Sequence, residues 1–256
     1  MLDQKLEEVP WTLRQTFIGF FLSLIPRVVF TFGLMLLGAS SVAARTPLAP
    51  GVDLTNAIIL FLLNGLVEVT FLIGPVYMAR RVLRELKIVP RLRTILQVLS
   101  FRGFKASTAL PLVLFCFLAI IGINWLYQLI IVAMHLKLQT NDQTVLQLGK
   151  VAPISMYSLL FLAVFVAPFC EEVLFRGFLF AGFLRAMPLS LAVVLSAFIF
   201  AAAHGDVASF PVLFCIGVLL ALLRWHTGSL WPGILLHLLN NAWSAISIIL
   251  VLHGAG

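Results

Sequence analysis

The chain has 256 residues, of which 62% are hydrophobic and 11% are charged. A soluble domain carries about 25% charged residues, so this composition excludes a soluble globular protein and indicates an integral membrane protein. Continuous apolar runs of about 20 residues favour transmembrane helices over a β-barrel, whose strands are about ten residues long and alternate in polarity. The net charge of +7 does not point to a nucleic-acid partner, because the basic residues cluster at the edges of the apolar runs.

The apolar runs predict an all-α fold, a polytopic membrane helical bundle with about seven transmembrane helices. The expected spans are approximately 17–37, 56–79, 109–134, 154–184, 189–204, 210–225 and a seventh that begins after Gly228 and ends near 252. The chain then divides into a lead-in (1–16), N-terminal transmembrane helices (17–148) and a C-terminal helical core (149–256). We expect the bacterial plasma membrane, with the N-terminus in the cytoplasm and the C-terminus outside.

Several residues are expected at the membrane surface. The loop 80–108 carries eight basic residues and one acid, Glu85; the basic residues are Arg80, Arg81, Arg84, Lys87, Arg91, Arg93, Arg102 and Lys105. The positive-inside rule places this loop in the cytoplasm. Its interleaved apolar residues predict an interfacial amphipathic helix that lies on anionic lipid, or else a dock for a partner or substrate. Tryptophans at span edges, among them Trp11, suit the aromatic belts.

Two adjacent carboxylates lie inside the fourth predicted span, at Glu171 and Glu172. A charge at the centre of a bilayer costs about 2.5–3.5 kcal/mol on insertion scales. Glu172 and Arg176 are spaced i, i+4, so they share a helix face and can pair. Glu171 is rotated by about 100° from Glu172, so we expect it to point at a different helix. A further intramembrane acid, Glu68, is expected to pair with Arg27.

Three later polar residues could meet Glu171 inside the bilayer: His204, His237 and Asn241. At about 1.5 Å per helical residue, all four residues lie about 12–22 Å from the cytoplasmic edge. The hydrocarbon core is about 30 Å thick, so they occupy one band of depth. They lie on the fourth, fifth and seventh expected spans, so the packing of these helices can bring them together.

Two kinds of chemistry suit this set. Glu171 beside a neutral His204 can polarise a water molecule, while His237 and Asn241, again i, i+4, can donate hydrogen bonds to an oxyanion. Alternatively, Glu171, His204 and His237 form a His₂Glu set, which binds catalytic zinc and leaves one position for water. Both predict hydrolysis of an acyl bond within the membrane. The sequence contains neither HExxH nor GxSxG, so the motifs of common soluble hydrolases are absent.

Three motifs carry a specific resemblance: Glu171-Glu172-x-x-x-Arg176, Phe200-x-x-x-His204 and His237-x-x-x-Asn241. In this order, on successive helices, they resemble the CPBP family of CAAX prenyl proteases and bacteriocin-processing proteases, also called the Abi family. The resemblance covers about residues 150–250. It implies an all-helical intramembrane endopeptidase in which Glu171 and His204 activate the water and His237 with Asn241 form the oxyanion site. Glu172, Arg176 and Phe200 would support them. Members are described both as metalloproteases and with a metal-free glutamate mechanism, so the implied cofactor is one zinc ion or none.

Two other functions remain open at this stage. The same fold could serve as a non-catalytic membrane scaffold or immunity protein, although a scaffold has no need of the full motif set. A proton-coupled transporter could use Glu171, Glu68 and the histidines as carriers. As a protease, the protein is expected to cleave a peptide precursor or membrane protein, with or without a lipid attached. The sequence does not indicate an oligomeric state.

Overall fold

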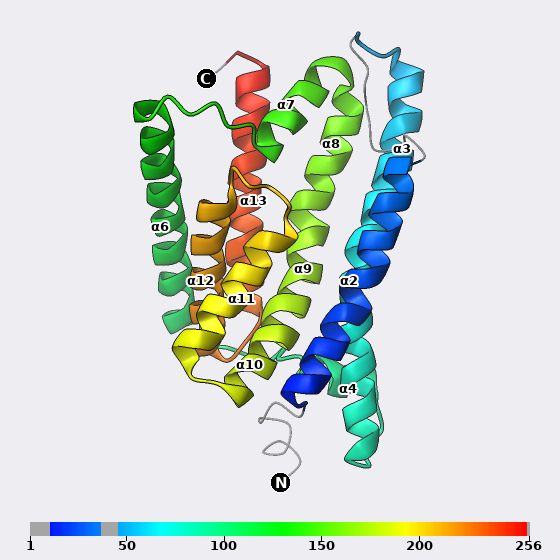
Figure 1. Cartoon of the computed structure of the whole chain (residues 1–256), viewed down its shortest axis with the longest axis vertical. Helices are drawn as coiled ribbons and strands as arrows, with labels where there is room; N and C mark the ends of the chain where they lie inside the picture. Colours follow the sequence, from blue (N-terminus) through cyan, green and yellow to red (C-terminus); the bar gives the residue numbers. More distant parts are fainter. Residues whose placement is uncertain (1–10, 37–45, 255–256) are drawn as a thin grey trace.

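The structure, a computed structural model, describes residues 11–36 and 46–254, and over these ranges it is helical without any strand (Figure 1). The elements are α2 (Leu13–Leu36), α3 (Pro50–Val69), η1 (Thr70–Leu72), α4 (Ile73–Glu85), α5 (Leu92–Val98), α6 (Ala106–Ala133), α7 (Asn141–Val151), α8 (Pro153–Phe161), η2 (Leu162–Val166), α9 (Ala167–Glu172), η3 (Val173–Leu179), α10 (Phe180–Ala186), α11 (Leu189–Ala203), α12 (Phe210–Thr227) and α13 (Trp231–Leu252). Among them are six helices long and apolar enough to cross a membrane, and a shorter apolar one, α11. The predicted all-α polytopic bundle is confirmed.

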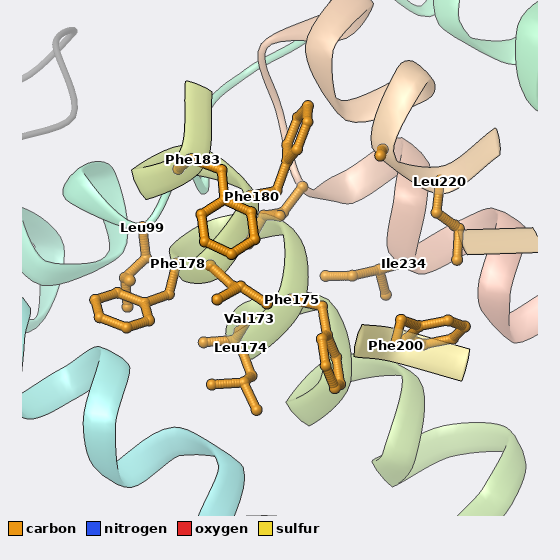
Figure 2. Close-up of a cluster of buried hydrophobic side chains, with 14 of the residues drawn as sticks. Leu99, Val173, Leu174, Phe175, Phe178, Phe180, Phe183, Phe200, Leu220 and Ile234 are labelled. Atoms are coloured by element: carbon orange, nitrogen blue, oxygen red, sulfur yellow. The ribbon is translucent and has the colours of Figure 1, made fainter. Parts of the chain in front are cut away.

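The long helix from α8 to α10 is the centre of the bundle. It runs without a break from Pro153 to Ala186, and 56% of its most apolar stretch is buried, against 22–33% in the other five. Two π-helical stretches, η2 and η3, lie on either side of α9. The side chains of η3 and α10 form much of the apolar core, including Phe175, Phe178 and Phe183 (Figure 2).

The start of the central helix is held by a carboxylate from another helix. Asp53, in the first turn of α3, is buried and accepts hydrogen bonds from the backbone N–H groups of Ile154 (2.8 Å) and Ser155 (3.0 Å) and from the Ser155 hydroxyl (2.6 Å). The first N–H groups of a helix have no partner within it. Asp53 therefore acts as an N-cap supplied from a distance of about 100 residues along the chain, and it fixes α8 against α3.

The fifth predicted span is shorter than the others. α11 has 15 residues, or about 22 Å at the α-helical rise, and it stops short of the far end of the bundle (Figure 1). Its loop to α12 is held by Asp206, which accepts hydrogen bonds from Asn141 N (2.9 Å), Ser209 N (2.9 Å) and Ser209 Oγ (2.8 Å). The Tyr127 hydroxyl donates to Ala208 O. Partial burial acts to raise the pKa of Asp206, but these hydrogen bonds outweigh it and the net pKa lies below its ordinary value.

The segments between the expected spans contain further helices. In the segment 80–108, α4 extends to Glu85 and α5 has seven residues, of which Ile95 and Val98 are buried. The segment 135–153, between the third and fourth expected spans, contains α7, which begins with a capping box at Thr140. A capping box satisfies the free N–H groups locally and so starts a helix in a polar sequence.

Trp11, in the predicted lead-in (1–16), packs inside the bundle. Trp11 is fully buried, its indole N–H donates to Phe178 O (3.3 Å), and it is not in an aromatic belt as predicted. Residues 1–10 of the lead-in and 37–45 of the first loop lie outside the described residues.

Candidate active site

The glutamate pair lies at the end of α9, between the two π-helical stretches. Glu171 and Glu172 are 7% and 0% exposed. A π-helical turn adds a residue to the helical repeat and frequently occurs at functional sites. Here the wider turns lie directly beside the two carboxylates that the sequence singled out.

The predicted ion pair of Glu172 and Arg176 is confirmed. Arg176 Nη1 donates to Glu172 Oε1 at 2.8 Å, and both side chains are at most 1% exposed. The guanidinium carbon lies 4.1 Å from the centre of the Phe200 ring. A cation over an aromatic face is attracted by the ring quadrupole, so the arginine is stabilised by α9 on one side and by α11 on the other.

His237, on α13, contacts both glutamates. Its Nδ1 lies 3.2 Å from Glu172 Oε1, and its Nε2 lies 3.8 Å from Glu171 Oε2. The close approach of α13 to α9 depends on Gly233, because a Cβ at that position would lie 2.9 Å from Glu172 Oε2. His237 is one helical turn beyond this glycine, so the same contact sets its distance from the carboxylates.

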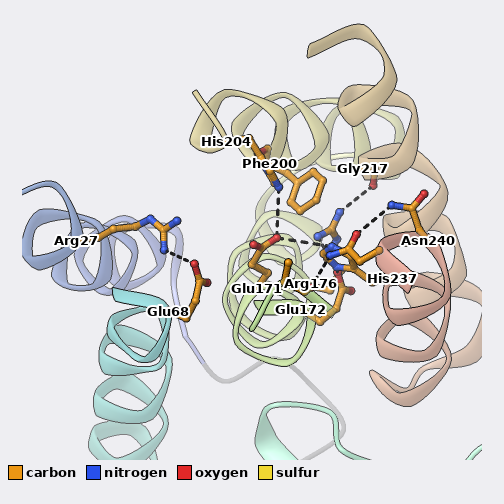
Figure 3. Close-up of polar contacts among 12 residues, drawn as sticks. Arg27, Glu68, Glu171, Glu172, Arg176, Phe200, His204, Gly217, His237 and Asn240 are labelled. Carbon is orange, nitrogen blue, oxygen red and sulfur yellow. Dashed lines mark hydrogen bonds and ion pairs between the residues drawn. The ribbon is translucent and has the colours of Figure 1, made fainter. Parts of the chain in front are cut away.

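His204, the C-cap residue of α11, lies above Glu171 in Figure 3, whereas His237 lies to the right of Glu171. Its Nδ1 lies 2.8 Å from Phe200 O. A carbonyl oxygen can only accept, so Nδ1 carries a proton and donates it. In the neutral ring Nε2 then presents a lone pair, and it lies 3.6 Å from Glu171 Oε2. The His204 imidazole therefore caps the end of α11 through Nδ1 and faces Glu171 through Nε2.

Glu171 Oε2 is the point on which these groups converge. It is buried and has no hydrogen-bond partner within residues 11–36 and 46–254. The two distances, 3.6 Å to His204 Nε2 and 3.8 Å to His237 Nε2, exceed those of N–H···O bonds, which are about 2.7–3.2 Å. If His237 donates its Nδ1 proton to Glu172, three lone pairs face one another. A water molecule placed among them can donate one hydrogen bond to each of two.

The other polar groups nearby have partners of their own. Asn241 Nδ2 donates to Ala163 O (2.8 Å), and its Oδ1 accepts from Asn240 (3.1 Å). The second hydrogen of its amide is still available, but no contact joins Asn241 to Glu171 within the described residues. Arg27 and Glu68 form the predicted pair, with Nη1 and Oε1 3.1 Å apart, and they lie to one side of Glu171 (Figure 3).

The donors at Glu171 are of the types that bind zinc, namely one carboxylate oxygen and two imidazole nitrogens. The described part of the chain nevertheless contains no group of three or more His, Cys, Asp and Glu side chains arranged to hold a metal ion.

A comparison with family models finds one match, over part of the chain. Residues 153–243 match the family described as type II CAAX prenyl endopeptidase Rce1-like. The resemblance to the CPBP family of CAAX proteases is confirmed. The match supports a CAAX-type intramembrane endopeptidase, and hence an integral membrane protease with a protein or peptide substrate. No curated protein and no solved structure matched the chain.

The Rce1-like region holds every residue of the three motifs, but sequence reasoning missed residues that position them. Gly233 admits Glu172, and Asp206 holds the loop that follows His204. Asp206 stands three residues before Ser209 at the start of α12, a spacing typical of helix caps, so its local contact was visible in the sequence. The contact of Asp206 with Asn141 and that of Gly233 with Glu172 were not visible in the sequence, because each joins segments that are far apart in the chain.

Proposed function

We propose that this protein is an intramembrane endopeptidase in which Glu171 and His204 activate a water molecule that attacks a peptide carbonyl. The observation that carries the proposal is the pair of facing lone pairs on Glu171 Oε2 and His204 Nε2, 3.6 Å apart. A water molecule beside the line that joins them can donate one hydrogen bond to each. Glu171 is buried, and the His204 side chain is 24% exposed; electrostatic interactions at such a partly dehydrated site are stronger than in bulk water.

The reaction then needs only proton transfers and one nucleophilic attack. Glu171 accepts a proton from the water as its oxygen bonds to the peptide carbonyl carbon, and the carbonyl oxygen becomes an oxyanion. Glu171 returns this proton to the amide nitrogen as the carbon–nitrogen bond breaks. His204 orients the water through Nε2, because its Nδ1 proton is committed to Phe200 O.

His237 and Asn241 are the proposed oxyanion donors. His237 Nε2 faces the same space as Glu171 Oε2, and in the protonated ring it donates while Nδ1 remains on Glu172. Asn241 has one amide hydrogen beyond that given to Ala163 O. Its contribution requires a substrate that reaches the α13 face beside it. Glu172 and Arg176 position His237 rather than touch the substrate.

The proposed substrate is a peptide precursor or membrane protein, with or without a lipid, whose cleavage site reaches the bilayer interior. We propose that the basic end of the bundle faces the cytoplasm, because α4 and the segment that follows it to residue 105 carry eight of the 17 arginines and lysines. One zinc ion bound by Glu171, His204 and His237 is the alternative within the same reaction class, and it would supply a Lewis acid for the same water.

The test compares purified wild-type protein in lipid nanodiscs with Glu171→Gln and His204→Asn on a quenched fluorescent peptide library that includes lipidated members. Loss of a general base typically lowers the rate by about 10²–10⁴, so we expect kcat to fall within this range for Glu171→Gln with little change in folding. Glu85→Gln, which changes an exposed ion pair on α4, is the matched control and should retain full activity.

Two results would count against the proposal. Cleavage that is unaffected by Glu171→Gln rejects the site, and an absence of cleavage by folded wild type across the library favours the scaffold function. Metal content is measured on the same samples. Stoichiometric zinc that is lost in both variants assigns the zinc mechanism instead.

A further inference from the structure

An apolar cavity lies at the basic end of the bundle, apart from the glutamate cluster. It measures about 280 Å³ and is lined by α4, the segment that follows it, α5 and one face of α9 and η3. Its lining includes Val76, Arg80, Leu96, Phe101, Phe169 and Val173. Binding pockets for whole small molecules are about 300–1,000 Å³, so this cavity suits one flexible hydrocarbon chain rather than a large ligand.

The cavity and the catalytic groups lie on different faces of the central helix. Phe169 and Val173 line the cavity and are spaced i, i+4. Glu171, two residues after Phe169, is rotated by about 200° from it and faces α11 and α13 instead. A peptide bond held at Glu171 therefore lies on a different face of the central helix from this cavity.

Arg80 indicates what that occupant carries. It is the only charged residue in the lining, it is exposed, and among the described residues it has no hydrogen-bond or ion-pair partner. Residues 80–93 contain six basic residues and one acid, a net charge of 6 − 1 = +5. The acid, Glu85, is already paired with Arg81. Apolar residues between them, such as Val89 (65% exposed), lie outside the lining and suit contact with lipid.

We propose that this cavity binds an acyl chain of an anionic phospholipid, with the phosphate headgroup held by Arg80. The hydrocarbon fills the apolar lining, and the negative charge meets the uncompensated arginine at the mouth. The cavity wall also connects to the catalytic helices. The Phe101 ring lies 5.4 Å from Phe169, near the start of α9, and 5.3 Å from Trp231, the first residue of α13. A bound chain thus stabilises the contact between the helices that carry Glu171 and His237.

The test uses phosphatidylglycerol with a photoreactive group on one acyl chain, added to the full-length protein in phosphatidylcholine nanodiscs, with labelled sites mapped by mass spectrometry. We expect labelling to concentrate on peptides that contain 90–101 and 169–173. Arg80→Gln should lower it by about five-fold, since one basic residue near an anionic surface is worth about 1 kcal/mol. Leu96→Trp, which fills the cavity, should lower it further.

Two control variants separate a site from general lipid contact. Arg84→Gln removes an exposed charge from the same helix, and Leu86→Trp enlarges an exposed apolar residue outside the cavity lining. Both should lower labelling less than Arg80→Gln and Leu96→Trp do, and unlabelled phosphatidylglycerol should raise the thermal unfolding temperature of wild type by more than that of Arg80→Gln.

Three outcomes would overturn the proposal. These are labelling spread evenly around the bundle, equal labelling by a phosphatidylcholine probe, and displacement of the probe by an isoprenoid alcohol but not by phosphatidylglycerol. The last would assign the cavity to a prenyl chain. None depends on peptidase activity, so this proposal can fail while the proposed function stands.

Discussion

Replacing Arg176 with methionine tests whether the glutamate cluster is held together by charge. The guanidinium compensates Glu172, and both side chains are at most 1% exposed. Removing it leaves a buried carboxylate whose remaining partner is His237 Nδ1 at 3.2 Å. Loss of one member of a buried ion pair costs about 3–5 kcal/mol, which is a large part of the about 5–15 kcal/mol that stabilises a typical protein.

A second variant also removes the uncompensated charge of Glu172. In the double variant Arg176→Met with Glu172→Gln, no uncompensated ion remains, and the glutamine carbonyl still accepts from His237. Replacing both members of a buried pair with neutral groups is often close to neutral, so we expect the double variant to be more stable than Arg176→Met by about 2 kcal/mol or more.

Equilibrium unfolding in mixed micelles measures these free energies. The matched control is Arg81→Met, which breaks an i, i+4 pair of similar length (2.9 Å) whose side chains are 48% and 52% exposed. Exposed pairs of this spacing contribute about 0.3–0.5 kcal/mol. If Arg176→Met lost no more stability than this control, or if the double variant were no more stable than Arg176→Met, charge compensation would not be what holds the cluster.

Three further predictions concern residues outside the motifs. Asp53→Ala removes the cap of α8 and should lower the free energy of unfolding by about 1–2 kcal/mol, measured in the same micelles. The hydrogen bonds that lower the pKa of Asp206 contribute stability that is fully present above its ordinary pKa of 3.8 and is lost as the pH falls through the lower folded-state pKa; thermal unfolding of wild type should show this acid-dependent loss, and Asp206→Asn should not. Gly233→Ala places a methyl group against Glu172 and should cost about 1–3 kcal/mol together with peptidase activity, whereas Gly122→Ala, where nothing lies within 4 Å, should not destabilise.

The sequence by itself determined the class of the protein and the contacts within one helix. Apolar runs long enough to span a bilayer force the backbone into helices, because lipid offers it no hydrogen bonds. The i, i+4 spacing of Glu172 and Arg176 predicted their ion pair, since residues at that spacing share a helix face wherever the helix lies. The same geometry turned Glu171 away from Glu172 and toward other helices.

Only the tertiary structure decided which atoms meet across helices. His204 presents Nε2 to Glu171 because Nδ1 is committed to Phe200 O, and His237 spans both glutamates because Gly233 lets α13 come close. In the same way, the contact of Trp11 with Phe178 joins two residues that are 167 positions apart in the sequence. Helix periodicity sets the direction of a side chain from its own axis, but the crossing angles and separations of the helices set what it reaches. Those angles follow from the packing of the whole bundle and are not written in any one motif.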